Sequence, residues 1–189
     1  ELQLVRERHF SARTLQTKEQ QRGEDRRLRG ELAELFRRNG FSKEISHQLA
    51  AWDPYDQNAH SNFFDPEWMF GVTDGFEVVI GNPPYVRIQT LKQQDPKYAE
   101  FLKKHYEAAS KGNFDLYVVF VERGMQLLKG DGNLAYILPH KFFNAQYGEP
   151  LRGLLARGKH LAHIVHFGDQ QVFPGTTNYV CLLFLRRTG

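Results

Sequence analysis

A short apolar run that ends in two prolines constrains the fold of this chain more than any other feature. Phe76-Glu-Val-Val-Ile80 has the composition of a buried strand, and Gly81-Asn82-Pro83-Pro84-Tyr85 follows it directly. In an open α/β fold, such a strand delivers the residues behind it to the carboxyl edge of a parallel sheet, where ligands bind. The sequence therefore predicts a ligand site at 82–85.

Beyond residue 76, apolar runs alternate with helical stretches, which is typical of α/β folds. The glycines of Lys129-Gly130-Asp131-Gly132 predict the end of one such helix. The expected helices cover residues 97–108, 114–128 and 149–157, and the expected strands cover 76–80, 134–138, 161–167 and 178–186, the last after a turn at Pro174-Gly175. A helix that separates successive strands predicts parallel strand pairing at the centre of the sheet.

The first 75 residues have a different pattern. Residues 1–50 are rich in Arg, Glu, Gln and Leu, and their apolar residues fall on one helix face, which predicts an amphipathic helical segment that stops near Gly40. These face residues are Leu28, Leu32, Leu35 and Phe36. Residues 51–75 combine Pro, Gly and Asn with several large aromatics and predict an ordered loop. We therefore expect three segments, namely 1–50, 51–75 and an α/β subdomain over 76–189.

Composition limits the cellular setting more than the function. The 189 residues carry a net charge of +3, which permits a polyanionic partner without requiring one. No apolar run approaches the roughly 20 residues that span a bilayer, and no signal peptide is visible, so we expect a cytoplasmic protein with no membrane partner. The single cysteine, Cys181, lies in an apolar run and predicts buried packing without a disulfide.

Each residue type at 82–85 suits the binding of an exocyclic amine. The side-chain carbonyl of Asn82 can accept a hydrogen bond from such an amine without carrying a charge. The prolines fix the backbone, and they leave the carbonyl of Pro83 free to accept a second hydrogen bond from the same amine. Tyr85 offers a flat face on which a flipped base can stack. This chemistry needs neither a metal nor a covalent enzyme intermediate.

The sequence around these residues resembles a known family. Gly75-Phe-Glu-Val-Val-Ile-Gly-Asn-Pro-Pro-Tyr-Val86 is similar to the catalytic motif of gamma-class (TaqI-like) DNA adenine-N6 methyltransferases, as found in type IIG restriction-modification enzymes. The similarity extends over about residues 63–187. It includes the blocks Asn113-Phe-Asp-Leu-Tyr-Val-Val-Phe-Val-Glu122, Leu127-Leu-Lys-Gly-Asp-Gly-Asn-Leu-Ala-Tyr-Ile-Leu-Pro139, Lys141-Phe-Phe-Asn-Ala-Gln-Tyr-Gly148 and Gln171-Val-Phe-Pro174.

The resemblance implies a function and a set of roles. It implies methyl transfer from S-adenosylmethionine to a flipped adenine in double-stranded DNA, with catalytic residues Asn82, Pro83, Pro84 and Tyr85. Tyr85 and Phe173 would hold the target base, and Phe120 would line the adenine of the cofactor. Without the resemblance, both phenylalanines would be taken for core residues.

Two parts of the family pattern are missing from the sequence. No Gly-x-Gly after a strand occurs before residue 76, although the family holds the methionine part of its cofactor there, and the domain that selects the DNA sequence would begin after about residue 187. We therefore expect the C-terminal half of a three-layer, Rossmann-like methyltransferase fold, with a helical N-terminal segment and a terminal antiparallel strand pair. The missing cofactor half and the recognition domain are expected partners, and strand 76–80 is expected to lie at an open edge.

Other functions remain open at this level. Asn-Pro-Pro-Tyr also occurs in enzymes that methylate a glutamine of release factors and, with variant last residues, in rRNA methyltransferases. A non-catalytic DNA-binding or scaffold fragment is a further alternative. His160, His163 and His166 invite a metal interpretation, but residues three apart on a strand point to opposite faces, so we expect no metal.

Overall fold

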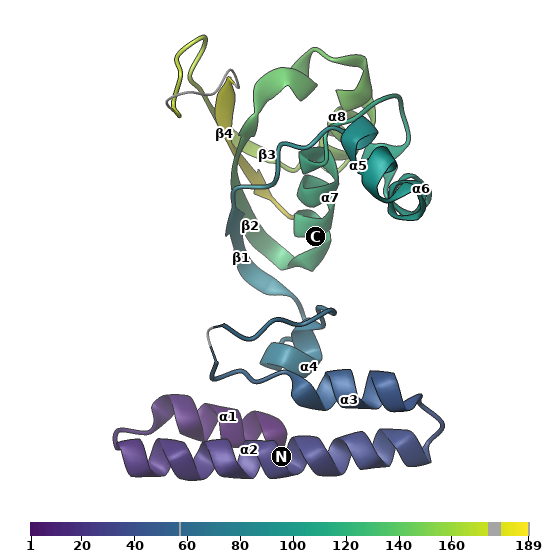
Figure 1. Ribbon diagram of the computed structural model, residues 1–189. Helices are drawn as coiled ribbons and strands as arrows, with labels where there is room; N and C mark the ends of the chain where they lie inside the picture. The colour runs from purple at the N-terminus through teal and green to yellow at the C-terminus, as the bar shows by residue number, and fades with distance from the viewer. Residues whose placement is uncertain (57, 174–178, 189) are drawn as a thin grey trace. The chain divides into compact units, whose positions relative to one another are not determined.

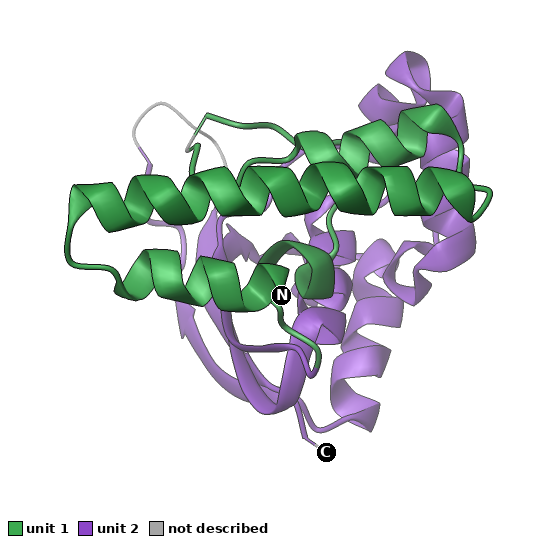
Figure 2. Ribbon diagram, turned by 90° about the horizontal axis from the view of Figure 1, so that it is seen from below, with its two compact units in different colours: residues 1–73 green, residues 74–189 purple. Residues whose placement is uncertain are grey.

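The computed structural model describes residues 1–56, 58–173 and 179–188. The chain divides into two compact units, residues 1–73 and residues 74–189 (Figure 2). The predicted turn at Pro174-Gly175 and Asn178, the first residue of the last predicted strand, lie outside the described residues. None of the described helices is both long enough and apolar enough to cross a membrane.

Unit 1 is helical over residues 1–50, as predicted, but the ordered loop expected at 51–75 contains a short helix. It contains α1 (Leu2–Ser11), α2 (Leu15–Arg38), α3 (Lys43–Ala51) and α4 (Pro66–Phe70). Three of these helices start at side-chain caps, because the side-chain oxygens of Thr14, Ser42 and Asp65 each accept a hydrogen bond from the backbone N–H three residues later. Helix α2 ends just before Gly40, whose φ of +90° suits glycine.

A buried ion network holds unit 1 together. The carboxylate of Asp25 is fully buried, and it accepts a hydrogen bond from Nε of Arg6 at 3.0 Å and from Nε of Arg29 at 2.7 Å. Arg6 also donates to the carbonyl of Trp68, and Arg29 donates to the carbonyl of Ala50. Asp25 and its two arginines thereby link α1 and α2 to backbone carbonyls of α3 and α4.

Unit 2 is built on a four-stranded sheet with the order β1-β2-β4-β3 (Figure 1). Strand β1 pairs in parallel with β2, whereas β4 is antiparallel to both β2 and β3. The strands are β1 (Phe76–Gly81), β2 (Leu128–Pro139), β3 (Leu161–His166) and β4 (Val180–Arg186), and the helices are α5 (Ile88–Gln94), α6 (Pro96–His105), η1 (Glu107–Ala109), α7 (Tyr117–Leu127), η2 (His140–Phe143), η3 (Gln146–Gly148) and α8 (Glu149–Arg157). The α/β class and the terminal antiparallel pair are thus confirmed, and β1 lies at an edge of this sheet.

The layer count differs from the prediction. Within unit 2 the helices lie on one face of the sheet, which gives two layers where we expected three (Figure 1). The reason is topological: the connections β1 to β2 and β2 to β3 progress in the same direction across the sheet, and right-handed crossovers then fall on one face. On β1, Val78 and Ile80 are 59% and 75% exposed.

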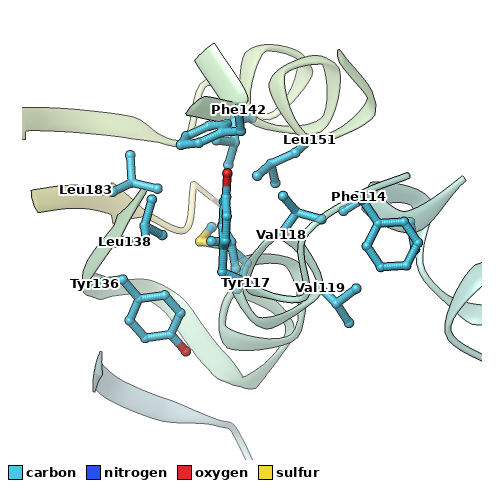
Figure 3. Close-up of a cluster of buried hydrophobic side chains, with 14 of the residues drawn as sticks. Phe114, Tyr117, Val118, Val119, Tyr136, Leu138, Phe142, Leu151 and Leu183 are labelled. Carbon is cyan, nitrogen blue, oxygen red and sulfur yellow. The ribbon is translucent and has the colours of Figure 1, made fainter. Parts of the chain in front are cut away.

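The core of unit 2 lies between the sheet and its helices. Alternate residues of β2 and β4 point into it, and Tyr117 of α7 stands at its centre beside Phe142 (Figure 3). Large members with less than 2% exposure include Phe114, Tyr117, Phe142, Leu134, Leu138, Leu151, Leu183 and Leu185. These residues form the support for the carboxyl edge of the sheet.

The junction between α7 and β2 differs from the prediction, because the strand starts directly after the helix. Helix α7 ends at Leu127, within a residue of its predicted end, but β2 begins at Leu128, well before the strand predicted at 134–138. Leu128 pairs with Phe76 and Asn133 pairs with Val78, so the glycine-rich turn forms an irregularity inside the β2 ladder. Its Asp131 has a φ of +64°.

Gly75, immediately before β1, packs against this junction. Its φ is +95°, and a Cβ at this position would lie 2.6 Å from the backbone nitrogen of Lys129. We expect Gly75→Ala to lower the free energy of unfolding of unit 2 by about 2–3 kcal/mol, because both the backbone conformation and the contact become strained. Amide hydrogen exchange in β2 measures this loss. The control is Gly130→Ala, where a Cβ meets nothing within 4 Å; an equal loss in both variants would contradict the explanation.

Candidate active site

The Asn-Pro-Pro-Tyr segment leaves β1 at the carboxyl edge of the sheet. Because β1 and β2 are parallel, with Gly81 opposite Tyr136, their carboxyl ends lie at the same edge. Pro83 is buried, whereas the Asn82 side chain is exposed and makes no hydrogen bond to any residue that the structure describes. The amide of Asn82 is therefore free to take an external partner.

Tyr85 is anchored to the neighbouring strand. Its hydroxyl donates a hydrogen bond to the carbonyl of Ile137 in β2 at 3.2 Å, and its ring is half-buried against the core cluster. Burial raises the pKa of the Tyr85 hydroxyl above its ordinary value, which keeps the group protonated as a donor. The ring is thus held at a fixed position three residues from Asn82.

The chain that follows Tyr85 is tied to the start of α7. The backbone N–H of Leu116 donates to the carbonyl of Val86 at 2.7 Å, and the N–H of Ile88 donates to the carbonyl of Phe114 at 3.0 Å. These bonds fix the exit of the Asn-Pro-Pro-Tyr segment. They also place the first turn of α7 beside it.

A buried chain of hydroxyls supports the same junction. The hydroxyls of Tyr117 and Tyr147 are 2.8 Å apart, and Tyr147 donates to the carboxylate of Asp115 at 2.9 Å. Burial is the main cause that raises the pKa of both tyrosines, so both remain hydrogen-bond donors. No sequence pattern predicts a role for these residues, since only the folded chain brings 115, 117 and 147 together.

Phe120 lies one turn into α7. It is 39% exposed, although its neighbours Val119 and Val121 are buried. An exposed aromatic on an otherwise buried segment suits contact with a flat ligand such as the adenine of S-adenosylmethionine. The methionine end of that cofactor has no matching element here, because the described residues before β1 contain helices α1–α4 and no strand followed by a glycine-rich loop. The residues present therefore fit one end of the cofactor.

Phe173 belongs to the connection that leaves β3. Strand β3 runs in the same direction as β1, so this connection starts at the edge that carries Asn82. Three strand spacings separate β1 from β3, which is about 14 Å. Phe173 is half-buried, and its connection has to extend across β4 and β2 to approach Tyr85. Val172 precedes it, while Pro174 of the predicted turn lies outside the described residues.

Metal-binding side chains do not gather around these residues in the described part of the chain. Among residues 1–56, 58–173 and 179–188, no group of three or more His, Cys, Asp or Glu side chains could hold a metal ion. His163 and His166 lie on β3, as the strand interpretation of that segment predicts.

Comparisons with curated proteins find similarity to restriction-modification methyltransferases. Type II restriction enzyme and methyltransferase RM.Eco57I from Escherichia coli is 43% identical over 112 residues, which cover 59% of this chain and 11% of that protein. Type II methyltransferase M.PaeR7I from Pseudomonas aeruginosa is 35% identical over 115 residues, 60% of this chain and 19% of that protein. Type II methyltransferase M.BstVI from Geobacillus stearothermophilus is 29% identical over 163 residues, 85% of this chain and 27% of that protein.

The family follows from a match over most of the sequence. The sequence model of the Eco57I restriction-modification methylase family matches residues 8–173, and the chain belongs to this family. The predicted restriction-modification methylase and its cofactor, S-adenosylmethionine, are thereby confirmed at the level of the family. The chain spans between about a tenth and about a quarter of the length of the three relatives named above.

Proposed function

We propose that this chain supplies the target-base site of a DNA adenine-N6 methyltransferase. The observation that carries the proposal is the arrangement at the end of β1. There the exposed Asn82 amide, which has no hydrogen-bond partner among the described residues, lies three residues from a Tyr85 ring anchored to β2. Such an arrangement suits a base that has left the double helix. Double-stranded DNA is the proposed partner.

The proposed chemistry uses hydrogen-bond acceptors only. The side-chain carbonyl of Asn82 and the backbone carbonyl of Pro83 each accept a hydrogen bond from one N–H group of the exocyclic amine. The nitrogen lone pair is then drawn out of conjugation with the ring and turned toward the methyl donor. Both acceptors stabilise the positive charge that develops on nitrogen, so rigid positioning and electrostatics account for catalysis. Pro84 adds stiffness, because its ring fixes φ between Pro83 and Tyr85.

Two further aromatics complete the proposed site. Phe173 contacts the flipped adenine from the β3–β4 connection, and Phe120 contacts the adenine of the cofactor. S-adenosylmethionine, when bound, supplies the methyl group as an electrophile. We assign the rest of the S-adenosylmethionine site and the recognition of a DNA sequence to residues outside this sequence.

The role of Tyr85 can be tested with two substitutions. Tyr85→Ala removes a stacking contact worth about 1–3 kcal/mol, so we expect methyl transfer to fall by roughly 5- to 150-fold. Tyr85→Phe keeps the ring and loses only the hydrogen bond to Ile137. We expect it to retain most of the rate in single-turnover assays. A Tyr85→Phe variant as slow as Tyr85→Ala would show that the anchor, and not the ring, matters.

The proposal as a whole is tested by the polymer that receives the methyl group. The full-length protein that carries this sequence is incubated with labelled S-adenosylmethionine and with unmethylated duplex DNA, rRNA or release-factor protein in separate reactions. We expect label in the DNA alone. Label in RNA or in protein would support one of the rival methyltransferases, and DNA binding without label in any acceptor would support a non-catalytic module.

A further inference from the structure

A cluster of four rings lies at the carboxyl edge of the sheet, outside the residues assigned above. His140 follows the end of β2, Phe143 ends η2, His166 ends β3, and Tyr179 directly precedes β4. The ring centroids of His140 and His166 are 4.2 Å apart. His140 also lies 6.3 Å from Phe143 and 6.2 Å from Tyr179, with interplanar angles of 17° and 25°. His140 is the ring that contacts all the others.

Two of these rings lie at the ends of the connection between β3 and β4. His166 is the last residue of β3 and Tyr179 the residue before β4, so they stand at the two ends of the connection that carries Phe173. His140 belongs to neither strand, yet its ring contacts the rings at both ends. Its backbone N–H donates to the carbonyl of Tyr179 at 3.2 Å. The connection is therefore fastened at both ends to one residue beyond β2.

The first turn of the connection is fixed from the same cluster. The N–H of Gly168 donates to Nδ1 of His166 at 2.9 Å, and Gly168 has a φ of +61°. The N–H of Gln170 then donates to the carbonyl of Phe167 at 3.2 Å. A displaced His166 ring would release this turn, and residues 170–173 would lose their fixed starting point.

The contacts of the His140 side chain are made by its ring and not by its Nε2 nitrogen. Its Nε2 is buried and has no hydrogen-bond partner in the described part of the chain. The ring is thus held by contacts with the neighbouring rings and not by a hydrogen bond from a described residue to Nε2. A flat ring without the nitrogen should therefore serve the same purpose.

We propose that His140 is a positioning residue that fastens both ends of the β3–β4 connection and so sets the position of Phe173 against the target base. The inference rests on the proposed function, because the contact of Phe173 with the flipped adenine is part of it. A shift of the connection by about 1 Å at such a site can cost up to roughly 100-fold in rate.

The test compares His140→Ala with His140→Phe in the full-length protein. In His140→Ala we expect amides of residues 167–173 to exchange at least about tenfold faster, while amides of β1 and β2 keep their wild-type exchange. We expect kcat for DNA methylation to fall by about 10- to 100-fold, with the KM for S-adenosylmethionine unchanged. His140→Phe should keep both exchange and kcat within about threefold of wild type. The matched control is His163→Ala, an exposed histidine of β3 outside the cluster.

Each outcome separates this inference from the function on which it rests. Unchanged exchange of residues 167–173 in His140→Ala would overturn the fastening role, whatever the enzyme methylates. Failure of His140→Phe to restore kcat would also overturn it, because the nitrogen would then matter more than the ring. Loss of exchange protection throughout unit 2 would show a folding defect in place of local positioning. A protein that labels no DNA refutes the proposed function, while the exchange measurement still decides the role of His140.

Discussion

Replacement of Asn82 by alanine is expected to lower the rate of methyl transfer by about 100- to 1000-fold. The side-chain carbonyl of Asn82 is one of two acceptors proposed for the reacting amine, and loss of a single preorganised hydrogen bond to a transition-state charge has an effect of this size. The change should act mainly on kcat, since the amine gains positive charge only as the reaction proceeds. Single-turnover assays with the full-length protein measure the effect.

The fold should tolerate this substitution. Asn82 is exposed and makes no side-chain hydrogen bond to a described residue, so Asn82→Ala should leave the thermal unfolding midpoint within about 1 °C of wild type. The control is Asn133→Ala, which removes an exposed asparagine from the neighbouring strand β2 and should keep wild-type activity. An Asn82→Ala enzyme as fast as wild type would remove Asn82 from the catalytic role.

Replacement of Asp25 by alanine is expected to destabilise unit 1 by about 3–5 kcal/mol. The substitution removes the carboxylate that pairs with Arg6 and leaves the buried Arg29 only its longer ion pair with Asp53 at 3.8 Å. An unpaired buried charge is far more costly than the loss of a surface ion pair. A unit of this size has only about 4–11 kcal/mol of stability in total. The isolated unit is therefore expected to lie close to unfolding in this variant.

Tryptophan fluorescence isolates this effect, because both tryptophans of the chain, Trp52 and Trp68, belong to unit 1. Urea titration of the 189-residue chain should show the loss in its fluorescence transition. The control is Glu34→Ala, which removes exposed ion pairs with Arg37 and Arg38 on the same helix and should have a much smaller effect. Equal transitions for wild type and Asp25→Ala would contradict the role of the buried network.

The features that sequence predicted well are those set by local chemistry. Strand β1, helix α8 and strand β3 follow apolar periodicity and lie within a residue of their expected bounds. The amide and the aromatic of the Asn-Pro-Pro-Tyr segment were predicted at the carboxyl edge because a strand leads directly into prolines. The structure has them at that edge.

The features that sequence did not predict depend on distant residues. Helix α5 is short and polar, and it forms where residues 86–88 are tied to residues 114–116. Likewise, the glycine-rich turn at 129–132 has helix-stop chemistry, but pairing with β1 incorporates it into β2. Local propensity cannot reveal either result, since both require a partner more than 20 positions away.

The candidate site shows the same division. The roles of Asn82 and Tyr85 follow from their own chemistry and their position behind a strand. The cluster around His140 arises from the ends of three different elements, and no spacing in the sequence predicts it. The regular spacing of the histidines at 160, 163 and 166 suggested a metal site. The contact of His166 with His140, which is not part of that series, could not be predicted from this spacing.

The chemical position of the transferred methyl group tests the central claim most directly. DNA methylated by the full-length protein is digested to nucleosides and analysed by mass spectrometry. The proposed target-base site predicts N6-methyldeoxyadenosine, absent from DNA treated with the Asn82→Ala enzyme. Methyl groups on a ring carbon, or on the amine of cytosine in place of adenine, would contradict it.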